Sequence, residues 1–375
     1  GRIVEEKREG DVLVFLSGEA LIKESMKSLQ MQPFRSKLHI QPLYGRLSRE
    51  EQEEVFPPAP KGKTKVVIST NIAETSITIS GITTVIDSGL AKLNHYNPRT
   101  YTSSLIEQAI SRASANQRKG RAGRTQPGIC YRLYARNDFE RRPLYTTEEI
   151  FRTDLSEVVL RMAELGINNF ESFHFISPPP GAGLRAAIET LHLLEALDED
   201  DYLSDIGTMM ARFPLQPVHS RMIVEAVRQY PDVIDQVLTA AAFLTSSTPF
   251  TLPPGEELEA RKAHHYYRDD MGDFVSYLRL LKAYQDAADK AAFCKKRYLD
   301  QRTMGEISNV KEQLSEIVGE MGVPIGSTGS TKDYLIAVSR GLIQFVCVRS
   351  GRGTYRTLTA DRIMIHPGSG LFRED

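Results

Sequence analysis

The first 135 residues alternate short apolar runs, rich in β-branched side chains, with amphipathic helical segments. This alternation predicts an α/β domain in which crossover helices join the strands of a parallel sheet. The predicted strands are residues 12–16, 38–43, 65–69, 83–87 and 128–133. The predicted helices are residues 19–29, 49–55 after the cap candidate Ser48, and 115–121 after the cap candidate Ser114. Residues 92–110 differ, because two β-favouring arms flank Asn97 and Pro98, and they predict a projecting hairpin.

Helical periodicity dominates after about Arg142. Amphipathic segments at 154–165, 184–197 and 221–230, with a short β-favouring run at 202–204, predict a winged helix followed by a helical domain that extends to about residue 321. The pattern turns β again from Asp333, with residues 342–348 and 355–358 as the clearest strands. We expect a partial β-barrel there, since too few strands remain to close one. The absent initiator Met and the abrupt end suggest a piece of a longer protein.

Charge is unevenly distributed along the 375 residues, although the net charge is −1. Residues 112–142 include nine basic and two acidic residues, and residues 334–360 include four arginines and no acid. Acidic residues gather elsewhere, as in the run 198–201. Basic surfaces can therefore line a channel for nucleic acid, while solvated faces without a partner explain the distribution equally well.

Composition excludes several classes of protein. The hydrophobic content of 41% and charged content of 25% are typical of a globular protein with two to four domains. No apolar run reaches the roughly 20 residues that span a bilayer, and no signal pattern is present, so we expect no membrane partner and a cytoplasmic location. Cys130, Cys294 and Cys347 lie far apart and lack the spacing of a zinc site, which fits a reducing compartment and predicts no structural metal.

The strongest chemical signal is QRKGRAGR at residues 117–124. At helical spacing Gln117, Arg121 and Arg124 fall on one stripe, and the small residues between them permit close approach. The planar donors of two guanidiniums suit a polyphosphate, and an arginine that neutralises charge in phosphoryl transfer contributes about 10³ to 10⁵ in rate. A solvated basic helix is the alternative on this segment alone.

Two further segments follow predicted strands. TNIAETSITISG at 70–81 offers many small donors, and LVFLSG ends at Gly18, whose missing Cβ lets a backbone approach a phosphate. Ligands of open parallel sheets bind at the carboxyl ends of the strands, so all three segments map to one sheet edge. Each alone is equally well a capped turn, but together they predict a phosphate-binding site.

Together these segments resemble motifs V and VI of the DEAH-box RNA helicases of superfamily 2. The resemblance covers essentially the whole chain, and its further motifs are LYGRL at 43–47, DSGL at 87–90, YNP at 96–98, GICYRLY at 128–134 and IHPGS at 365–369. The QRKGR and GIC sequences, with Asp138-Phe139 and Arg142-Pro143, are most similar to the bacterial HrpA type. The domains implied by the resemblance are a second RecA-like domain at 1–141, a winged helix at 142–207, a helical ratchet domain at 208–320 and the truncated start of an OB-fold at 321–375.

The resemblance also implies roles for individual residues. The residues expected at the ATP γ-phosphate are Arg121 and Arg124, with Gln117 organising the same catalytic site. Those expected at the nucleotide are Thr70, Asn71 and Ser80. Many eukaryotic members have Asp at the position of Ser80, which affects an expected ribose contact. The residues expected to contact RNA phosphates, or to sense the nucleotide state, are Ser17, Gly18, Thr75 and Ser76.

The chain has no P-loop. Gly62-Lys63-Thr64 matches the tail of that motif, but Pro57 replaces the first Gly and the segment leads into a strand. The acidic run 198–201 superficially suggests a magnesium site, yet it follows a helix. We therefore expect ATP and Mg²⁺ to be held mainly by a first RecA-like domain absent from this chain, and the chain alone to be inactive as an ATPase.

Two functions remain open from the sequence. The first is part of an ATP-dependent RNA helicase that translocates on single-stranded RNA, remodels duplexes or RNPs, and uses the hairpin as a wedge. Its partners are RNA, held largely without regard to sequence, and the first RecA-like domain, while a protein activator is left open. The second is a non-enzymatic RNA- or protein-binding platform of helicase descent. Retention of Gln117, Arg121 and Arg124 favours the motor.

A histidine pair and several tyrosines lie in the helical region. His264 and His265 are adjacent, so on a helix they point about 100° apart and do not suit one metal ion; we expect exposed surface. Tyr266, Tyr267, Tyr277 and Tyr284 recur at helical spacing. Core packing is the favoured interpretation of that spacing, and base stacking is the alternative.

Overall fold

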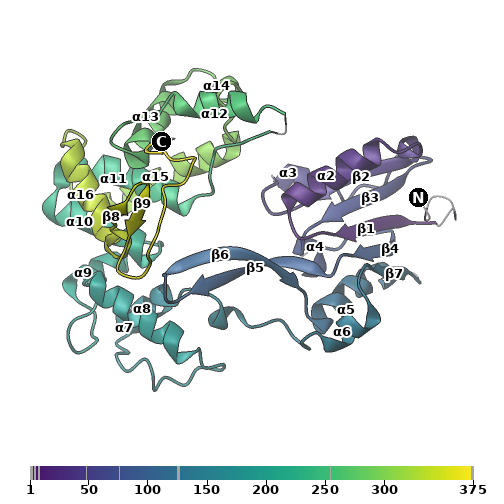
Figure 1. Ribbon diagram of the computed structural model, residues 1–375, viewed down its shortest axis with the longest axis horizontal. Helices are drawn as coiled ribbons and strands as arrows, with labels where there is room; N and C mark the ends of the chain where they lie inside the picture. Colours follow the sequence, from purple (N-terminus) through teal and green to yellow (C-terminus); the bar gives the residue numbers. More distant parts are fainter. Residues whose placement is uncertain are drawn as a thin grey trace. The chain divides into compact units, whose positions relative to one another are not determined.

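The computed structural model describes residues 3, 6, 9–47, 49–75, 77–124, 127–253 and 255–372. The cap candidate Ser48 and the expected RNA contact Ser76 lie outside these residues. The described chain forms two compact units, which we treat separately (Figure 1). One unit comprises Gly1–Tyr96 with Ser103–Thr153, and the other comprises Asn97–Thr102 with Asp154–Asp375.

Within its described residues, the first unit contains a five-stranded parallel sheet in the order β2-β3-β1-β4-β7. The strands are β1 (Asp11–Phe15), β2 (Leu38–Leu43), β3 (Thr64–Ser69), β4 (Ile82–Asp87) and β7 (Ile129–Arg132). The apolar runs thus predicted every strand of this sheet to within one residue at either end. Parallel pairing follows because the connections between strands contain helices.

Alternate strand residues build a core on each face of the sheet. Val12 packs with Ile22 on one face, and Leu13 packs with Ala122 on the other. Figure 1 shows α2 on one side of the sheet and α5 on the other. The helical segments of this unit are α2 (Glu19–Gln30), α3 (Arg49–Glu53), α4 (Ile72–Thr75), α5 (Arg112–Gly120), η2 (Arg121–Gly123), α6 (Arg136–Arg141) and the short turns Arg35–Lys37 and Glu149–Phe151.

Helix α5 begins earlier than predicted. The Ser111 hydroxyl accepts a hydrogen bond from the Ser114 backbone N–H at 3.1 Å, so Ser111 is the N-cap and the expected cap Ser114 lies inside the helix. At its other end the α-helix stops at Gly120 and the chain continues as the 3₁₀ turn η2. The tighter turn changes the direction of the side chains that follow, so the single helical stripe expected through Gln117, Arg121 and Arg124 does not form.

The expected hairpin is confirmed. Strands β5 (Leu90–Asn97) and β6 (Thr102–Ala109) form a two-stranded sheet of their own. Asn97 shapes the turn, because its side-chain oxygen accepts a hydrogen bond from the Arg99 N–H at 3.0 Å. The tip, Asn97–Thr102, groups with the second unit, where the Tyr101 hydroxyl donates to Glu189 at 3.4 Å.

The second unit is largely helical. Its first helices are α7 (Ser156–Glu164), α8 (Gly181–Leu193) and α9 (Asp205–Met210). A bridge between Leu197 and Leu203 stands where a short strand was expected. The helices that follow are α10 (Pro217–Gln229), α11 (Ile234–Thr245), α12 (Glu257–His265), α13 (Asp273–Asp286), α14 (Lys290–Arg297) and α15 (Gln301–Glu320), with a 3₁₀ turn at Pro231–Val233. None of the described helices combines the length and the apolar character needed to cross a bilayer.

A buried arginine joins several helices of this unit. Arg221 on α10 is 1% exposed, and its guanidinium lies 2.7 Å from Glu225 and 3.1 Å from Glu195. Glu195 follows α8 and also pairs with Arg340 at 2.5 Å, and the hydrogen bond from Arg340 is the main cause of the lowered pKa of Glu195. Through Glu195 and the Leu194 carbonyl, Arg221 fixes α10 against the end of α8.

The C-terminal segment differs from its prediction. Residues expected to turn β from Asp333 instead form α16 (Thr331–Gly341), capped by Ser330, and residues 343–345 form a 3₁₀ turn rather than a strand. Tyr334, Ala337 and Val338 are buried at helical spacing, a period hidden by their β-favouring side chains. Strands β8 (Val348–Gly351) and β9 (Thr354–Arg356) then form an antiparallel pair. In the described residues this pair is the C-terminal sheet, so an OB-fold is not confirmed.

Candidate functional site

The carboxyl ends of neighbouring strands bring the predicted motifs to one edge of the sheet. Strand β1 lies between β3 and β4, and the backbone of Leu16 bonds to Ser69 at 2.8 Å as the two strands end. Ser88, after β4, donates its backbone N–H to Phe15 at 3.3 Å. The loops that begin at Ser17, Thr70 and Ser88 therefore leave the sheet side by side. The first two belong to the segments that the sequence predicted at this edge, whereas the loop at Ser88 was not among them.

Arg118 organises this edge from inside the protein. It is fully buried, and its guanidinium lies 2.8 Å from Asp87 and 3.1 Å from Glu74. Glu74 also accepts a hydrogen bond from Ser114 at 2.5 Å. Tyr134 completes the network, because its hydroxyl donates a hydrogen bond to Asp87 at 2.8 Å. Burial and this hydrogen bond raise the pKa of Tyr134. The loop after β3, the end of β4 and helix α5 are thereby held together by charge.

Sequence reasoning missed the role of Arg118 and Glu74, although both stand inside the segments it singled out. Two arginines of the QRKGRAGR segment were assigned to phosphate by their spacing, whereas Arg118 points inward. The available signal was a lone acid in a hydroxyl-rich loop, Glu74, which requires a cation once it is buried.

Arg121 holds the loop after β3 through its backbone. Its Nε donates to the Glu74 carbonyl at 2.9 Å and Nη1 donates to the Ile77 carbonyl at 2.6 Å, while Nη2 also reaches the Glu74 carbonyl. The side chain is buried, and burial followed by the nearby charge of Arg124 lowers its pKa. Arg121 therefore shapes the loop in this conformation and presents little of its guanidinium to solvent.

Arg124 and Gln117 are the exposed members of the predicted set. Arg124 Nη1 donates to the Thr78 hydroxyl at 2.5 Å, and no carboxylate of the described residues pairs with it. Gln117 lies on the exposed side of α5. The structure thus brings Arg121 and Arg124 together on the loop of residues 74–78, with Arg124 the guanidinium that is accessible.

The residues expected at the nucleotide lie in the same loop region. Asn71 and Ser80 are exposed, and Thr70 is half-buried with its N–H bonded to the Leu43 carbonyl at 3.1 Å. Asn71 also lines a cavity of about 220 Å³ with Glu74 and Ser111. Hydroxyl and amide donors therefore surround this end of the loop, as its composition predicted.

The residues expected at RNA phosphates differ in how exposed they are. Thr75 is exposed. Ser17 is buried, and its hydroxyl donates to the Glu107 carboxylate on β6, so it contacts a phosphate only after that bond opens. A Cβ on Gly18 would lie 3.3 Å from the Lys92 side chain, which places a cation beside that backbone.

The P-loop-like segment 62–64 and the acidic run 198–201 lie in turns. Gly62 has a φ of 79° and precedes β3, which begins at Thr64, so no helix follows it as a P-loop requires. Asp198 accepts hydrogen bonds from the backbones of Asp200 and Tyr202, and the carboxylates of this run are largely exposed. In the described part of the chain, no group of three or more His, Cys, Asp or Glu residues is arranged to hold a metal ion.

Comparison with known proteins agrees with this architecture. Three family models match: the helicase conserved C-terminal domain over residues 1–126, the winged-helix part of the helicase associated domain HA2 over 187–215, and its ratchet-like part over 216–303. The fold and these matches define the C-terminal region of a helicase.

Known RNA helicases are similar to nearly the whole of this chain. The chain is 46% identical over 369 residues to the ATP-dependent RNA helicase HrpA of Borreliella burgdorferi, covering 98% of this chain and 45% of that protein. It is 34% identical over 383 residues to the probable ATP-dependent RNA helicase DHX35 of Homo sapiens, covering 100% of this chain and 54% of the relative, and the Pongo abelii protein is equally similar. The chain spans about half the length of these relatives. These similarities are consistent with the C-terminal part of a DEAH-box helicase.

Proposed function

We propose that this chain supplies one wall of the ATP site and part of the RNA path of an ATP-dependent RNA helicase. The convergence of Arg121 and Arg124 on residues 74–78, in the connection that follows the carboxyl end of β3, carries the proposal. In the complete enzyme, hydrolysis would drive translocation on single-stranded RNA and remodelling of duplexes or RNPs. A platform without activity has no comparable use for an accessible guanidinium beside this loop.

The donors at this edge fit phosphate rather than magnesium. They are guanidiniums, hydroxyls and amides, whereas magnesium selects carboxylate and water oxygens. Mg²⁺ and most contacts to ATP would belong to a P-loop domain outside this chain. Arg124 would neutralise charge on the γ-phosphate, while Arg121 holds the loop and moves onto phosphate when its carbonyl bonds open. Gln117, Thr70, Asn71 and Ser80 would border the same nucleotide.

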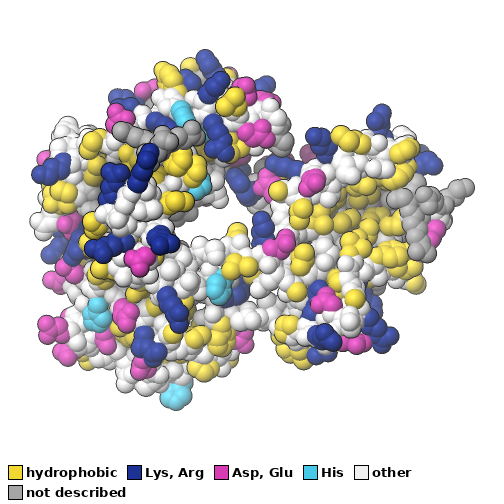
Figure 2. All heavy atoms as spheres, viewed as in Figure 1, with side chains coloured by type: hydrophobic (Ala, Val, Ile, Leu, Met, Phe, Trp, Pro, Cys, Tyr) yellow, Lys and Arg dark blue, Asp and Glu magenta, His cyan; other side chains and the backbone are white. Residues whose placement is uncertain are grey.

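RNA would be held mainly through its phosphates. We assign Thr75, Gly18, Ser17 and Ser76 to this contact in the first unit. In the second unit, Figure 2 shows Lys and Arg side chains gathered over the β8–β9 region, where Arg349, Arg352 and Arg356 are exposed. This pair of strands would be the start of an OB-fold. A cytoplasmic location completes the proposal, in keeping with three free cysteines.

The chain alone is expected to show no ATP turnover, with or without RNA. One wall of the site lacks the backbone cradle and the lysine that bind β- and γ-phosphates. Phosphate release by the purified chain, compared with the same chain joined to a P-loop domain, measures this. Turnover by the chain alone that Arg124→Ala abolishes would show a complete site and contradict the division proposed here.

The hairpin is expected to separate strands. Deleting tip residues 98–101 in a protein that includes the P-loop domain should reduce duplex unwinding by about tenfold or more, because the wedge is lost. RNA-stimulated ATP hydrolysis should persist, since Arg121 and Arg124 lie elsewhere in the fold. Strand-displacement and phosphate-release assays on one preparation test both expectations. A matched control, Tyr101→Phe, removes only the hydrogen bond to Glu189 and keeps the hairpin length. Equal unwinding by deletion variant and wild type would exclude a wedge.

A further inference from the structure

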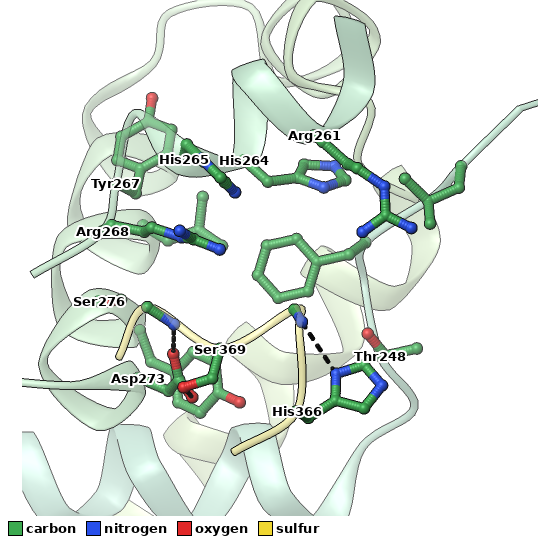
Figure 3. Close-up of a pocket in the computed structure, with 16 residues that line it drawn as sticks. Thr248, Arg261, His264, His265, Tyr267, Arg268, Asp273, Ser276, His366 and Ser369 are labelled. Atoms are coloured by element: carbon green, nitrogen blue, oxygen red, sulfur yellow. Dashed lines mark hydrogen bonds between the residues drawn. The ribbon is translucent and has the colours of Figure 1, made fainter. Parts of the chain in front are cut away.

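A cavity of about 440 Å³ lies within the second unit and has no role in the proposed motor (Figure 3). Its walls come from three separate parts of the chain: the segment before α12, the region from α12 to α13, and the turn of residues 366–370. Figure 3 shows Arg261, His264 and His265 along one side and Asp273, His366 and Ser369 along the other. Its volume falls in the range of about 300 to 1,000 Å³ that is usual for ligand pockets.

The cavity has an aromatic and apolar lining that is held rigidly. Phe250 packs edge-on against His264, with ring centroids 4.9 Å apart and planes at 65°. Tyr277 stacks on Phe243 at 4.4 Å, and Leu280 beside it is 1% exposed. The expectation that Tyr277 serves the core is confirmed in part, because it also lines this space. Such walls suit a flat aromatic ring.

Two arginines that form no ion pair within the described residues line the cavity. Arg261 and Arg268 both line it, and among the described residues no carboxylate lies within 4.0 Å of either guanidinium. His265 shares this side, and burial followed by the charges of Arg268, His264 and Arg261 lowers its pKa. His265 is exposed, as expected, whereas His264 is half-buried, and both line the cavity. An anion is the missing partner.

Carboxylates near the cavity are already engaged. Asp273 accepts hydrogen bonds from the Ser369 hydroxyl at 2.7 Å and from the Gly370 N–H at 2.6 Å. Asp269 pairs with Arg279 instead of Arg268. The bonds to Asp273 fix the turn of residues 366–370 against α13, and Asp273 forms no ion pair with Arg261 or Arg268. One side of the cavity therefore has a carboxylate that is already hydrogen-bonded, and the cavity also has two arginines that form no ion pair.

We infer that this cavity binds one phosphorylated nucleoside, with its base on Phe250 and Tyr277 and its phosphate at Arg261 and Arg268. Base stacking on an aromatic ring and a guanidinium on phosphate are the interactions that each part of such a ligand favours. The ligand is either a free mononucleotide or one nucleotide of an RNA strand. The site is separate from the ATP wall in the first unit, and neither proposal depends on the other.

Calorimetric titration of the 375-residue chain with 5′-AMP tests the site. Arg261→Gln and Arg268→Gln should each weaken binding by about tenfold or more, because each removes a charge-assisted hydrogen bond to phosphate. Adenosine and inorganic phosphate should each bind more weakly than 5′-AMP by a similar factor. The matched control is Lys262→Gln, which removes one charge from an exposed position of α12 that does not line the cavity and should leave binding unchanged. Circular dichroism confirms that each variant is folded.

The outcomes of this titration distinguish the proposed site from binding elsewhere on the chain, and a free mononucleotide from a nucleotide of RNA. Absence of 5′-AMP binding at millimolar concentration overturns the inference, as does binding that Arg124→Gln removes and Arg268→Gln does not. Displacement of 5′-AMP by a short single-stranded RNA, whose own binding Arg268→Gln weakens, identifies the ligand as a nucleotide of the strand. Retention of 5′-AMP in the presence of that RNA identifies a free mononucleotide.

Discussion

Replacing Arg124 by alanine is expected to lower ATP hydrolysis by about 10³-fold or more in a protein that joins this chain to a P-loop domain. Arg124 is an exposed guanidinium of the turn that follows α5, and its hydrogen bond to the Thr78 hydroxyl keeps it beside the loop of residues 74–78. Phosphoryl transfer develops charge on the γ-phosphate, which a fixed guanidinium neutralises at little reorganisation cost. Single-turnover phosphate release at saturating ATP measures the effect.

Matched variants show whether the loss arises from chemistry or from folding. Lys119→Ala removes an exposed charge two residues beyond Gln117 and should change the rate by no more than about twofold. Arg121→Ala should lower both the rate and the stability of the first unit, because Arg121 bonds the carbonyls of Glu74 and Ile77. A normal rate in Arg124→Ala would leave the non-enzymatic platform as the better account of the chain.

Replacing Arg118 by methionine is expected to destabilise the first unit by about 3 to 5 kcal/mol. Methionine fills much of the same volume but leaves Asp87, which is fully buried, without its ion-pair partner. It also removes the cation from Glu74 and from its place over the Phe15 ring, 4.8 Å from the centroid. Hydrogen-exchange mass spectrometry of peptides from β4 and α5 during urea unfolding measures the first unit separately from the second.

A double variant tests whether the unpaired charge of Asp87 causes the loss of stability. Adding Asp87→Asn to Arg118→Met removes the uncompensated charge and should recover part of the lost free energy of unfolding, although Tyr134 keeps a hydrogen-bonding partner at that position. Lys119→Met, an exposed neighbour on α5, should change stability by no more than about 0.5 kcal/mol. A loss below about 1 kcal/mol in Arg118→Met would contradict the role assigned to the buried ion pairs.

The local sequence pattern was sufficient to predict an element where the environment of each side chain is set within that element. Every strand of the parallel sheet was predicted because buried strands require continuous apolar runs, and the position of the loops followed because parallel strands end at one edge. Pattern failed where propensity and burial disagree. Residues 331–341 favour β structure by composition, but Tyr334 and Val338 are buried on one helical face, and packing against the neighbouring helix α10 decides their conformation.

The sequence by itself determined the α/β sheet, the helical second unit, the hairpin and the carboxyl edge from which the loop after β3 leaves the sheet. Tertiary structure alone decided which cations are buried and which are accessible. Arg118, Arg121 and Arg124 are the same residue type in one short segment, yet Arg118 pairs with buried acids, Arg121 binds carbonyls and Arg124 faces solvent. Their partners come from distant parts of the chain, as do the three walls of the second cavity. Periodicity fixes only neighbours within an element, and the energy of a buried charge depends on what other elements place beside it.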